Sequence, residues 1–257
     1  MENTQKNNYS RPPVTEAVIS VNISPSVGDN DLFKFVSKLK NIYPDLETTP
    51  NFDIKVDITE RNGVIDSNTN LTKLGQTHRL SRENMTQVVI VSPNSITVSQ
   101  LAPYRDWDDL FNRFIEVFDI KSRLIGYSEI TRIGVRYINR IDVPLVDGEN
   151  LIHQSEYLNV YPFLPKKFES IGDYAINCLI PYDEYEIKLN SAVIASPLLK
   201  HIAFLIDIDL YKDSKLGINP GPIPQKNEDF YKYVYEMRRY KNEIFESLIT
   251  DRTRSIF

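Results

Sequence analysis

The chain has 257 residues, 41% of them hydrophobic and 25% charged, which is the composition of a soluble globular protein with a sizeable core. Its formal net charge of −5 argues against general nucleic-acid binding, because a protein that coats nucleic acid needs a basic surface. The single cysteine, Cys178, excludes an intrachain disulfide and a metal centre built from cysteines. Residues 1–10 lack an apolar signal core, and no apolar run is long enough to span a membrane, so we expect a cytoplasmic location and no membrane partner.

The first predicted elements are a flexible tail, a strand and a helix. Polar residues 1–10 form the tail, and residues 14–23 alternate between apolar and polar side chains, as a half-buried strand does. The apolar side of this strand carries Ala17, Ile19, Val21 and Ile23. A helical stripe of apolar residues from Leu32 to Ile42 then predicts a helix that ends before Pro44.

More strands are predicted before the second helix. They cover residues 52–59, 77–81, 87–92 and 95–101. Residues 60–76 are polar and rich in Asn, Gly, Ser and Thr, so they predict a mobile loop. Asp106 provides the N-cap of a long amphipathic helix, and Gly126 provides its C-terminal stop.

The longest run with a strand period lies at residues 126–144. One side of this strand is apolar and carries Ile133, Val135, Tyr137, Ile141 and Val143. The other side carries Arg132, Arg136 and Arg140. Because a strand sends alternate side chains to opposite faces, we expect the three arginines to line one face of a sheet.

Three further strands and a long helix complete the chain. The strands are predicted at residues 173–181, 185–190 and 199–210, and the helix at residues 228–250. Residues 11–125 and residues 126–257 each run through several strands and close with a long amphipathic helix. This common plan indicates related halves, although no residue-level repeat is found.

We therefore predict a single α+β domain over residues 11–257. Its centre is a broad antiparallel sheet, or two related sheets, with one polar and one apolar face. Two long amphipathic helices and one shorter helix are expected to pack on the apolar face.

Charged side chains on several strands give the best candidate site. Asp207 and Asp209 share a face between apolar neighbours and are plausible partners for the three arginines. One interpretation is a solvated sheet face crossed by ion pairs that add little stability. The other is a face that clamps an anion, because the guanidinium fork suits phosphate and nearby carboxylates suit a divalent metal.

Alternation along a strand predicts that Glu184, Glu186 and Lys188 share a face. Their spacing resembles the E-x-E-x-K signature of the triphosphate tunnel enzymes. The resemblance implies that Glu184 and Glu186 hold a divalent metal and that Lys188 contacts a phosphate. In that family the motif opens the first strand of a charged antiparallel barrel, whereas here it lies in the second half of the chain.

Other catalytic signatures are missing from the sequence. The three histidines are dispersed, without a metal-ligand spacing, at positions His78, His153 and His201. The chain contains no G-x-S-x-G nucleophile motif, no Walker A loop and no G-x-G-x-x-G motif. No cofactor is therefore expected, except a divalent metal if the charged face binds a phosphorylated ligand.

Three segments together carry a resemblance to a known family. They are R-P-P-V-T-E-A-V from Arg11, R-I-G-V-R-Y-I-N-R from Arg132 and K-N-E-I-F-E-S-L-I-T-D from Lys241. The chain resembles a sporadically distributed family of uncharacterised bacterial and archaeal proteins. The resemblance implies no activity, and the patchy distribution implies an accessory gene, such as those of mobile elements or antiviral defence.

Two functions follow as hypotheses from these patterns. The first is a binding or interaction protein with a protein partner or self-association, because no catalytic constellation is assembled in the sequence. The second is an enzyme or sensor for a nucleotide or triphosphate, metal-assisted, that uses the charged face of the sheet.

Overall fold

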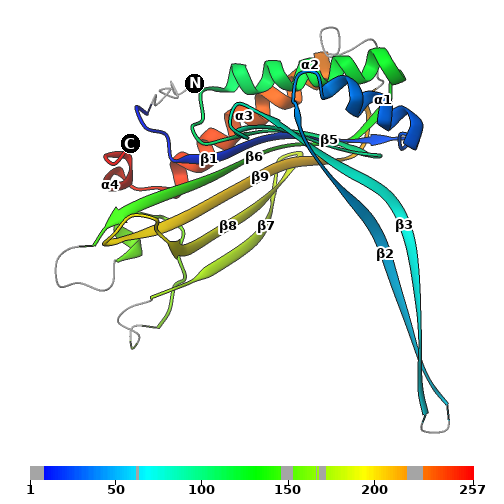
Figure 1. The fold of residues 1–257 in the computed structure, drawn as a ribbon. Coiled ribbons are helices and arrows are strands. Elements are labelled where there is room, and N and C mark those ends of the chain that lie inside the picture. Colours follow the sequence, from blue (N-terminus) through cyan, green and yellow to red (C-terminus); the bar gives the residue numbers. More distant parts are fainter. Residues whose placement is uncertain (1–8, 62–63, 146–152, 166, 168–171, 219–227) are drawn as a thin grey trace.

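A computed structural model of the chain describes residues 9–61, 64–145, 153–165, 167, 172–218 and 228–257. Its strands are β1 (Val14–Ser24), β2 (Asp45–Arg61), β3 (Val64–Arg82), β4 (Gln87–Ser92), β5 (Ser95–Leu101), β6 (Glu129–Pro144), β7 (Ala175–Tyr182), β8 (Tyr185–Ala195) and β9 (His201–Ile218). They form one sheet in the order β2-β3-β4-β5-β1-β6-β9-β8-β7 (Figure 1), and every neighbouring pair is antiparallel. The predicted α+β class and broad antiparallel sheet are confirmed, and the described strands make one sheet instead of two.

The helices cover one face of this sheet. They are α1 (Asp29–Leu39), α2 (Trp107–Ile125), α3 (Glu228–Leu248) and the short α4 (Asp251–Arg254), and a single 3-10 turn spans Gln154–Glu156. The first three lie together over the central strands (Figure 1). Between helices and sheet, the predicted apolar side of β1 is at most 4% exposed at Ala17, Ile19, Val21 and Ile23. Burial of such apolar area is the main favourable contribution to folding.

Local sequence signals set the ends of α2. The Asp106 side chain accepts a hydrogen bond from the Asp109 backbone N–H at 2.8 Å, which confirms the predicted N-cap. At the other end Gly126 has φ +88°, a backbone conformation that residues with a Cβ rarely adopt. The helix therefore stops where the sequence predicts.

The two halves of the chain lie on opposite sides of the sheet's centre. The first strands of the halves, β1 and β6, pair with each other. The last strands, β5 and β9, flank them, and the preceding strands β4 and β8 lie next outwards. In each half a long helix follows the last of these strands. That the halves are related stays a prediction.

The loop predicted between the two strands of the first long hairpin is wrong. Residues 60–76 were expected to be a mobile loop, but β2 and β3 are 17 and 19 residues long and pair along their whole length as one hairpin. The far part of this hairpin projects from the body (Figure 1). We call the arm the paired residues beyond the register shift after Asn51, which are 52–61 of β2 and 64–73 of β3. A strand exposed on both faces needs no alternation of apolar residues, so the Ser, Thr and Asn run of β3 resembles a loop in sequence.

The beginning and end of the described chain meet at one corner. The Tyr9 hydroxyl donates to Glu246 Oε1 at 2.6 Å, and the Arg11 N–H donates to the Phe257 carbonyl at 3.2 Å. Ser10 also donates to this carbonyl, at 2.7 Å. Of the predicted tail, residues 1–8 lie outside the described residues.

The two helix-terminal glycines provide a stability test. Gly126→Ser places a side chain at φ +88° and is expected to cost about 1–2 kcal/mol. Gly28, the residue before α1, has φ −69° and no side-chain cap, so Gly28→Ser is expected to stabilise by about 0.5 kcal/mol. A built Cβ meets nothing within 4 Å at either position, so the two variants differ in backbone conformation and capping. Urea unfolding measures both, and shifts of the same sign would contradict the prediction.

Candidate functional site

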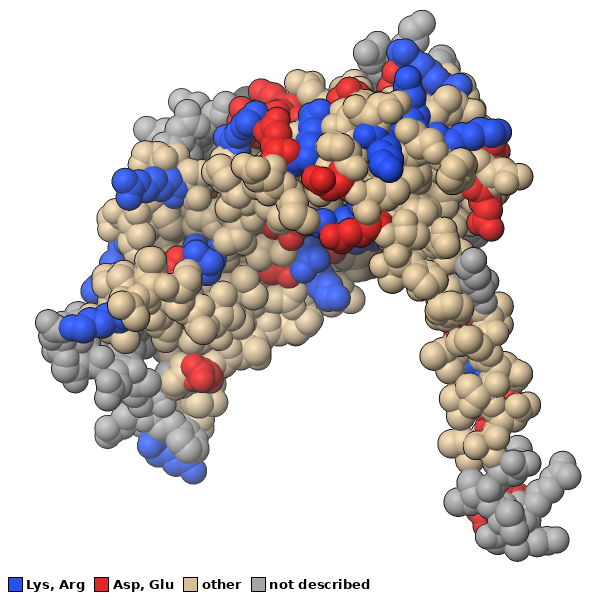
Figure 2. Space-filling model, viewed as in Figure 1, with Lys and Arg blue, Asp and Glu red and all other residues tan. Residues whose placement is uncertain are grey.

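The face of the sheet opposite the helices carries the predicted charged side chains. We call it the arginine face; its charged members are Arg132, Arg136, Arg140, Lys188, Glu16, Asp142, Glu186, Asp207, Asp209 and Asp213. None of the described helices covers this face (Figure 1), and Figure 2 shows an open hollow between the body and the arm on this side. The arginine face therefore borders this open space.

Strand β6 divides its side chains between the two faces as predicted. Ile133, Val135 and Ile141 are at most 1% exposed and lie in the core under the helices. The alternate residues Arg132 and Arg136 lie on the other face. The register of β6 and β9 confirms that the three arginines share a face with Asp207 and Asp209. The predicted pairing holds for Arg132 and Arg136 only, because Arg140 lies opposite Leu205.

Arg136 makes the closest ion pair on this face. Its Nε and Nη2 donate to the two carboxylate oxygens of Asp207 at 2.8 and 2.7 Å. Asp207 lies opposite Ile138, so the guanidinium reaches it diagonally across the strands. The Asn190 amide donates a third bond to Asp207 at 2.9 Å. The bonds to Asp207 raise the pKa of Arg136, and the Asp207 side chain is 6% exposed, so the arginine is held in place.

Arg132 has a more distributed set of contacts. Its Nη2 donates to Asp209 Oδ2 at 3.2 Å, and its Nε lies 3.4 Å from Asp213 Oδ1. The guanidinium also stacks over the Tyr211 ring at 4.3 Å from the centroid. Burial raises the pKa of the Asp209 carboxyl, although Arg132 and Arg136 act in the opposite direction.

Gly134 explains how Arg132 lies against the sheet. A Cβ at position 134 would be 3.0 Å from Arg132 Nη1 and 3.4 Å from both Ser20 Oγ and Tyr211 Cβ. The glycine therefore leaves room for the guanidinium between neighbouring strands. This is the structural reason for a glycine inside an otherwise β-branched strand.

Arg140 does not join the other two arginines. Its Nε donates at 3.1 Å to Asp142, two residues further along the same strand. The Ser196 hydroxyl donates to the other oxygen of Asp142 at 2.7 Å. The three arginines are thus on one face, but two of them meet Asp207 and Asp209 and the third has a separate carboxylate.

Lys188 occupies a different position from the arginines. It is exposed on β8, and Asp209 lies between it and Arg136 in one row of directly opposed residues. Among the described residues Lys188 has no hydrogen bond or ion pair. Lys188 is therefore a cation of the arginine face that a ligand can reach without displacing a carboxylate partner.

Glu184 and Glu186, which the sequence predicts as metal ligands, do not lie together in the structure. Glu184 precedes β8 in a turn after Asp183, which has φ +56°, and it pairs with Lys212. Lys212 lies over the rings of Tyr185 and Tyr233, on the helix side of the sheet. Glu186 instead accepts a bond from Tyr211 on the arginine face at 2.7 Å. The prediction that Glu184, Glu186 and Lys188 share a face is therefore wrong, because the turn rotates Glu184 to the opposite side.

In the part of the chain that the structure describes, no group of three His, Cys, Asp or Glu side chains is placed to hold a metal ion. His78 is packed in β3, with Nδ1 at 2.9 Å from the Thr48 hydroxyl, and His201 Nδ1 lies 2.7 Å from the Leu199 carbonyl. Cys178 is partly buried against the core, as its alternation with apolar residues indicates.

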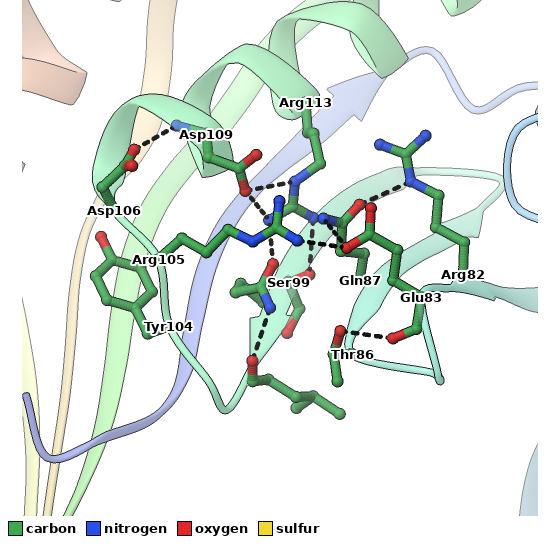
Figure 3. A network of polar contacts seen from close by, with 12 residues as sticks. Arg82, Glu83, Thr86, Gln87, Ser99, Tyr104, Arg105, Asp106, Asp109 and Arg113 are labelled. Atoms are coloured by element: carbon green, nitrogen blue, oxygen red, sulfur yellow. Dashed lines mark hydrogen bonds and ion pairs between the residues drawn. The ribbon is translucent and has the colours of Figure 1, made fainter. Parts of the chain in front are cut away.

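The sequence did not predict a second polar network, at the start of α2 (Figure 3). Arg113, which is 4% exposed, donates to Asp109 at 3.2 Å, to the Gln100 side chain at 2.7 Å and to the Ser99 carbonyl at 3.3 Å. Nearby, Arg105 pairs with Glu83 at 2.9 Å. The available signal was the four-residue spacing of Asp109 and Arg113, which in a sequence resembles an ordinary surface pair. These contacts fasten α2 to β5 and serve the fold.

A third cluster was also missed, under α3. The Lys241 ammonium lies 3.5 Å from the centroid of the Tyr137 ring, and the Tyr137 hydroxyl is 2.8 Å from that of Tyr104. Burial is the main cause that lowers the pKa of Lys241 to about 7. Tyr137 lies directly opposite Ala17 on β1. The three segments on which the family resemblance rests therefore meet around this ring.

Comparison with protein-family models and with curated proteins found no match to this chain. Among the described helices none has the length and apolar character needed to cross a membrane.

Lys241 makes stability depend on pH. Its pKa is about 7 in the folded protein against an ordinary value of 10.5, so between these values the unfolded chain binds more protons. The free energy of unfolding is therefore expected to rise from pH 7 to pH 9.5, by roughly 3 kcal/mol. Lys241→Met should remove the rise, whereas Lys232→Met, at an exposed lysine of the same helix, should keep it. Urea unfolding at the two pH values measures this, and equal slopes in both variants would contradict it.

Proposed function

We propose that this protein is a binding protein that holds a protein partner on the arginine face, as a component of an accessory or antiviral defence system. The observation that carries the proposal is Arg136. Its guanidinium is fixed by two bonds to Asp207, yet its side chain remains 44% exposed. A fixed, exposed arginine loses little conformational freedom when a partner binds.

The mixture of charges on the face supports a protein as the partner. Next to Arg136, the Asp209 side chain is 21% exposed, and Lys188 is exposed beyond it. Such a surface offers donors and acceptors within one row of residues. A protein surface carries both kinds of group in return, whereas a phosphate would be repelled by the carboxylates.

The partner is sought among the products of neighbouring genes, because the family resemblance implies an accessory gene. Co-expression followed by size-exclusion chromatography tests whether a complex forms. We expect Arg136→Ala to weaken it about tenfold to hundredfold, as loss of an anchoring arginine does. Arg123→Ala is the matched control: this exposed arginine pairs with Asp119 on α2, on the other side of the sheet, and its loss should leave binding unchanged.

Arg136→Ala also leaves the buried carboxylate of Asp207 without its guanidinium, so the variant's folding is verified by circular dichroism. Lys188→Glu provides a second variant, which reverses an exposed charge without breaking a buried pair. A complex that tolerates both changes, or a solitary protein that turns over a substrate, would refute the proposal.

One observation favours the second candidate function, a sensor or enzyme for a phosphorylated ligand. Lys188 and Arg136 lie on either side of Asp209, and Lys188 has no ion pair among the described residues. A phosphate could bridge these two cations, and under this candidate a divalent metal would offset the charge of the carboxylates Glu186 and Asp209.

Thermal unfolding with tripolyphosphate, with and without Mg²⁺, separates the two candidates. If the proposed protein-binding function is correct, we expect no change in Tm at millimolar ligand. An increase of about 2 °C or more that is lost in Lys188→Ala would support the phosphate candidate, since a ligand that binds only the folded state raises Tm. The same increase in Lys188→Ala would place the ligand elsewhere.

A further inference from the structure

The arm exposes a continuous apolar stripe. Its members and their exposed fractions are Phe52 (47%), Ile54 (62%), Val56 (52%), Ile58 (70%) and, on β3, Leu71 (62%). Leu71 lies directly opposite Ile54, so the five side chains share one face of the hairpin. A two-stranded ribbon with an uncovered apolar face is only marginally stable in water. The stripe therefore points to an interaction surface.

The stripe lies along the outer strand of the arm. Four of its five members belong to β2, which is the edge strand of the sheet and pairs only with β3. The residues of β3 opposite Val56 and Ile58 are Thr69 and Ser67, which are polar. The apolar side chains thus border the free edge, where backbone N–H and C=O groups are available for pairing with another strand.

The free edge has defined limits. At the body it is interrupted by Pro50, which has no N–H, and by a register shift between Asn51 and Phe52. At the far end β2 stops at Arg61. The uninterrupted stretch therefore runs from residue 52 to residue 61, and Val56 and Asp57 are its two central residues.

We propose that the protein forms a twofold dimer in which β2 pairs antiparallel with β2 of a second copy, with Val56 on the axis. In this register Ile54 lies opposite Ile58 of the partner subunit. On the polar face of the arm, Lys55 lies opposite Asp57 of the partner subunit. Since each of these two contacts occurs twice, the pairing is self-complementary at its centre, while further out Phe52 lies opposite Glu60 of the partner subunit.

Other registers are less favourable. With Lys55 on the axis, the two copies of Lys55 would face each other, and Asp53 would face Asp57 of the partner subunit; like charges directly opposite destabilise a sheet. With Ile54 on the axis, Ile58 would face Pro50 of the partner subunit, which cannot donate to the ladder. A shift of one residue would place apolar side chains opposite polar ones.

The charge of the arm also argues for a second copy of this chain over nucleic acid. Asp53, Asp57 and Glu60 are exposed on β2 beside a single exposed lysine, Lys55. Phosphate backbones need basic residues, whereas acidic residues outnumber basic ones in the sequence of β2. Pairing of two arms would make a four-stranded sheet, which is more stable than the isolated ribbon.

Disulfide trapping tests the register in the full-length protein. In a Cys178→Ser background, Val56→Cys places two thiols opposite each other across the axis, and we expect an intermolecular disulfide under mild oxidation. Ile58→Cys is the matched control on the same strand and face. In the proposed register the two copies of residue 58 are about 13 Å apart, so this variant should not cross-link.

Light scattering coupled to size-exclusion chromatography tests the dimer itself. Ile58→Lys buries a charge against Ile54 of the partner subunit and should weaken dimerisation about tenfold or more. Asn68→Lys, on the polar face of the same hairpin, should leave it unchanged. Equal Tm values of the two variants establish that both are folded.

Some outcomes would overturn the proposal. One is a monomer at about 100 µM, since a weaker dimer is too weak to be useful for an assembly. Another is a dimer that Ile58→Lys does not affect. A third is open-ended polymers, which indicate head-to-tail pairing of different edges. Cross-linking through Ile54→Cys or Ile58→Cys in place of Val56→Cys would refute the register. Binding of the arm to a different protein, with this chain monomeric, would refute the choice of partner. The proposal does not depend on the arginine face, so a dimer without a partner on that face would leave it standing.

Discussion

The structure depends on the pairing of β1 with β6 at the centre of the sheet. Both strands send one set of side chains into the core beneath the helices, with Ile19 and Val135 directly opposed and fully buried. That burial fixes the register, because a shift of one residue would exchange the two faces. The arginines of β6 are consequently held on the uncovered side, where each one meets a carboxylate.

Much of the fold could be predicted from the alternation of apolar and polar residues and from the turn residues that separate the strands. The bounds expected for β4 and β5 agree with the structure, because short apolar runs there end at Pro93 and Asn94. The return strand of the arm was missed because neither of its faces is buried, so its sequence lacks the apolar period that identifies a strand. The outer strand β2 was predicted because it carries an apolar stripe, although that stripe is exposed. Alternation therefore identifies strands with one apolar face and misses a polar strand such as the arm's part of β3.

The candidate site shows the same limit at the level of single residues. The sequence placed Arg136 and Asp207 on facing strands, but the diagonal contact between them depends on a register that only tertiary structure supplies. Glu184 was misplaced because one residue with positive φ, Asp183, decides the side on which it lies. The burial of Arg113 could not be predicted, because its four-residue spacing from Asp109 is also that of an exposed ion pair on a helix.

The central position of β1 has a consequence for how the chain folds. Ala17 pairs with Gln100 on one side and with Tyr137 on the other, so the neighbours of β1 come 83 and 120 residues later in the chain. In a growing polypeptide β1 therefore has no neighbour until β5 has been synthesised, and one of its edges stays open until β6 follows. Contacts between such distant segments slow folding and leave strand edges open to aggregation meanwhile. The centre of the sheet can form only after both halves of the chain have been synthesised.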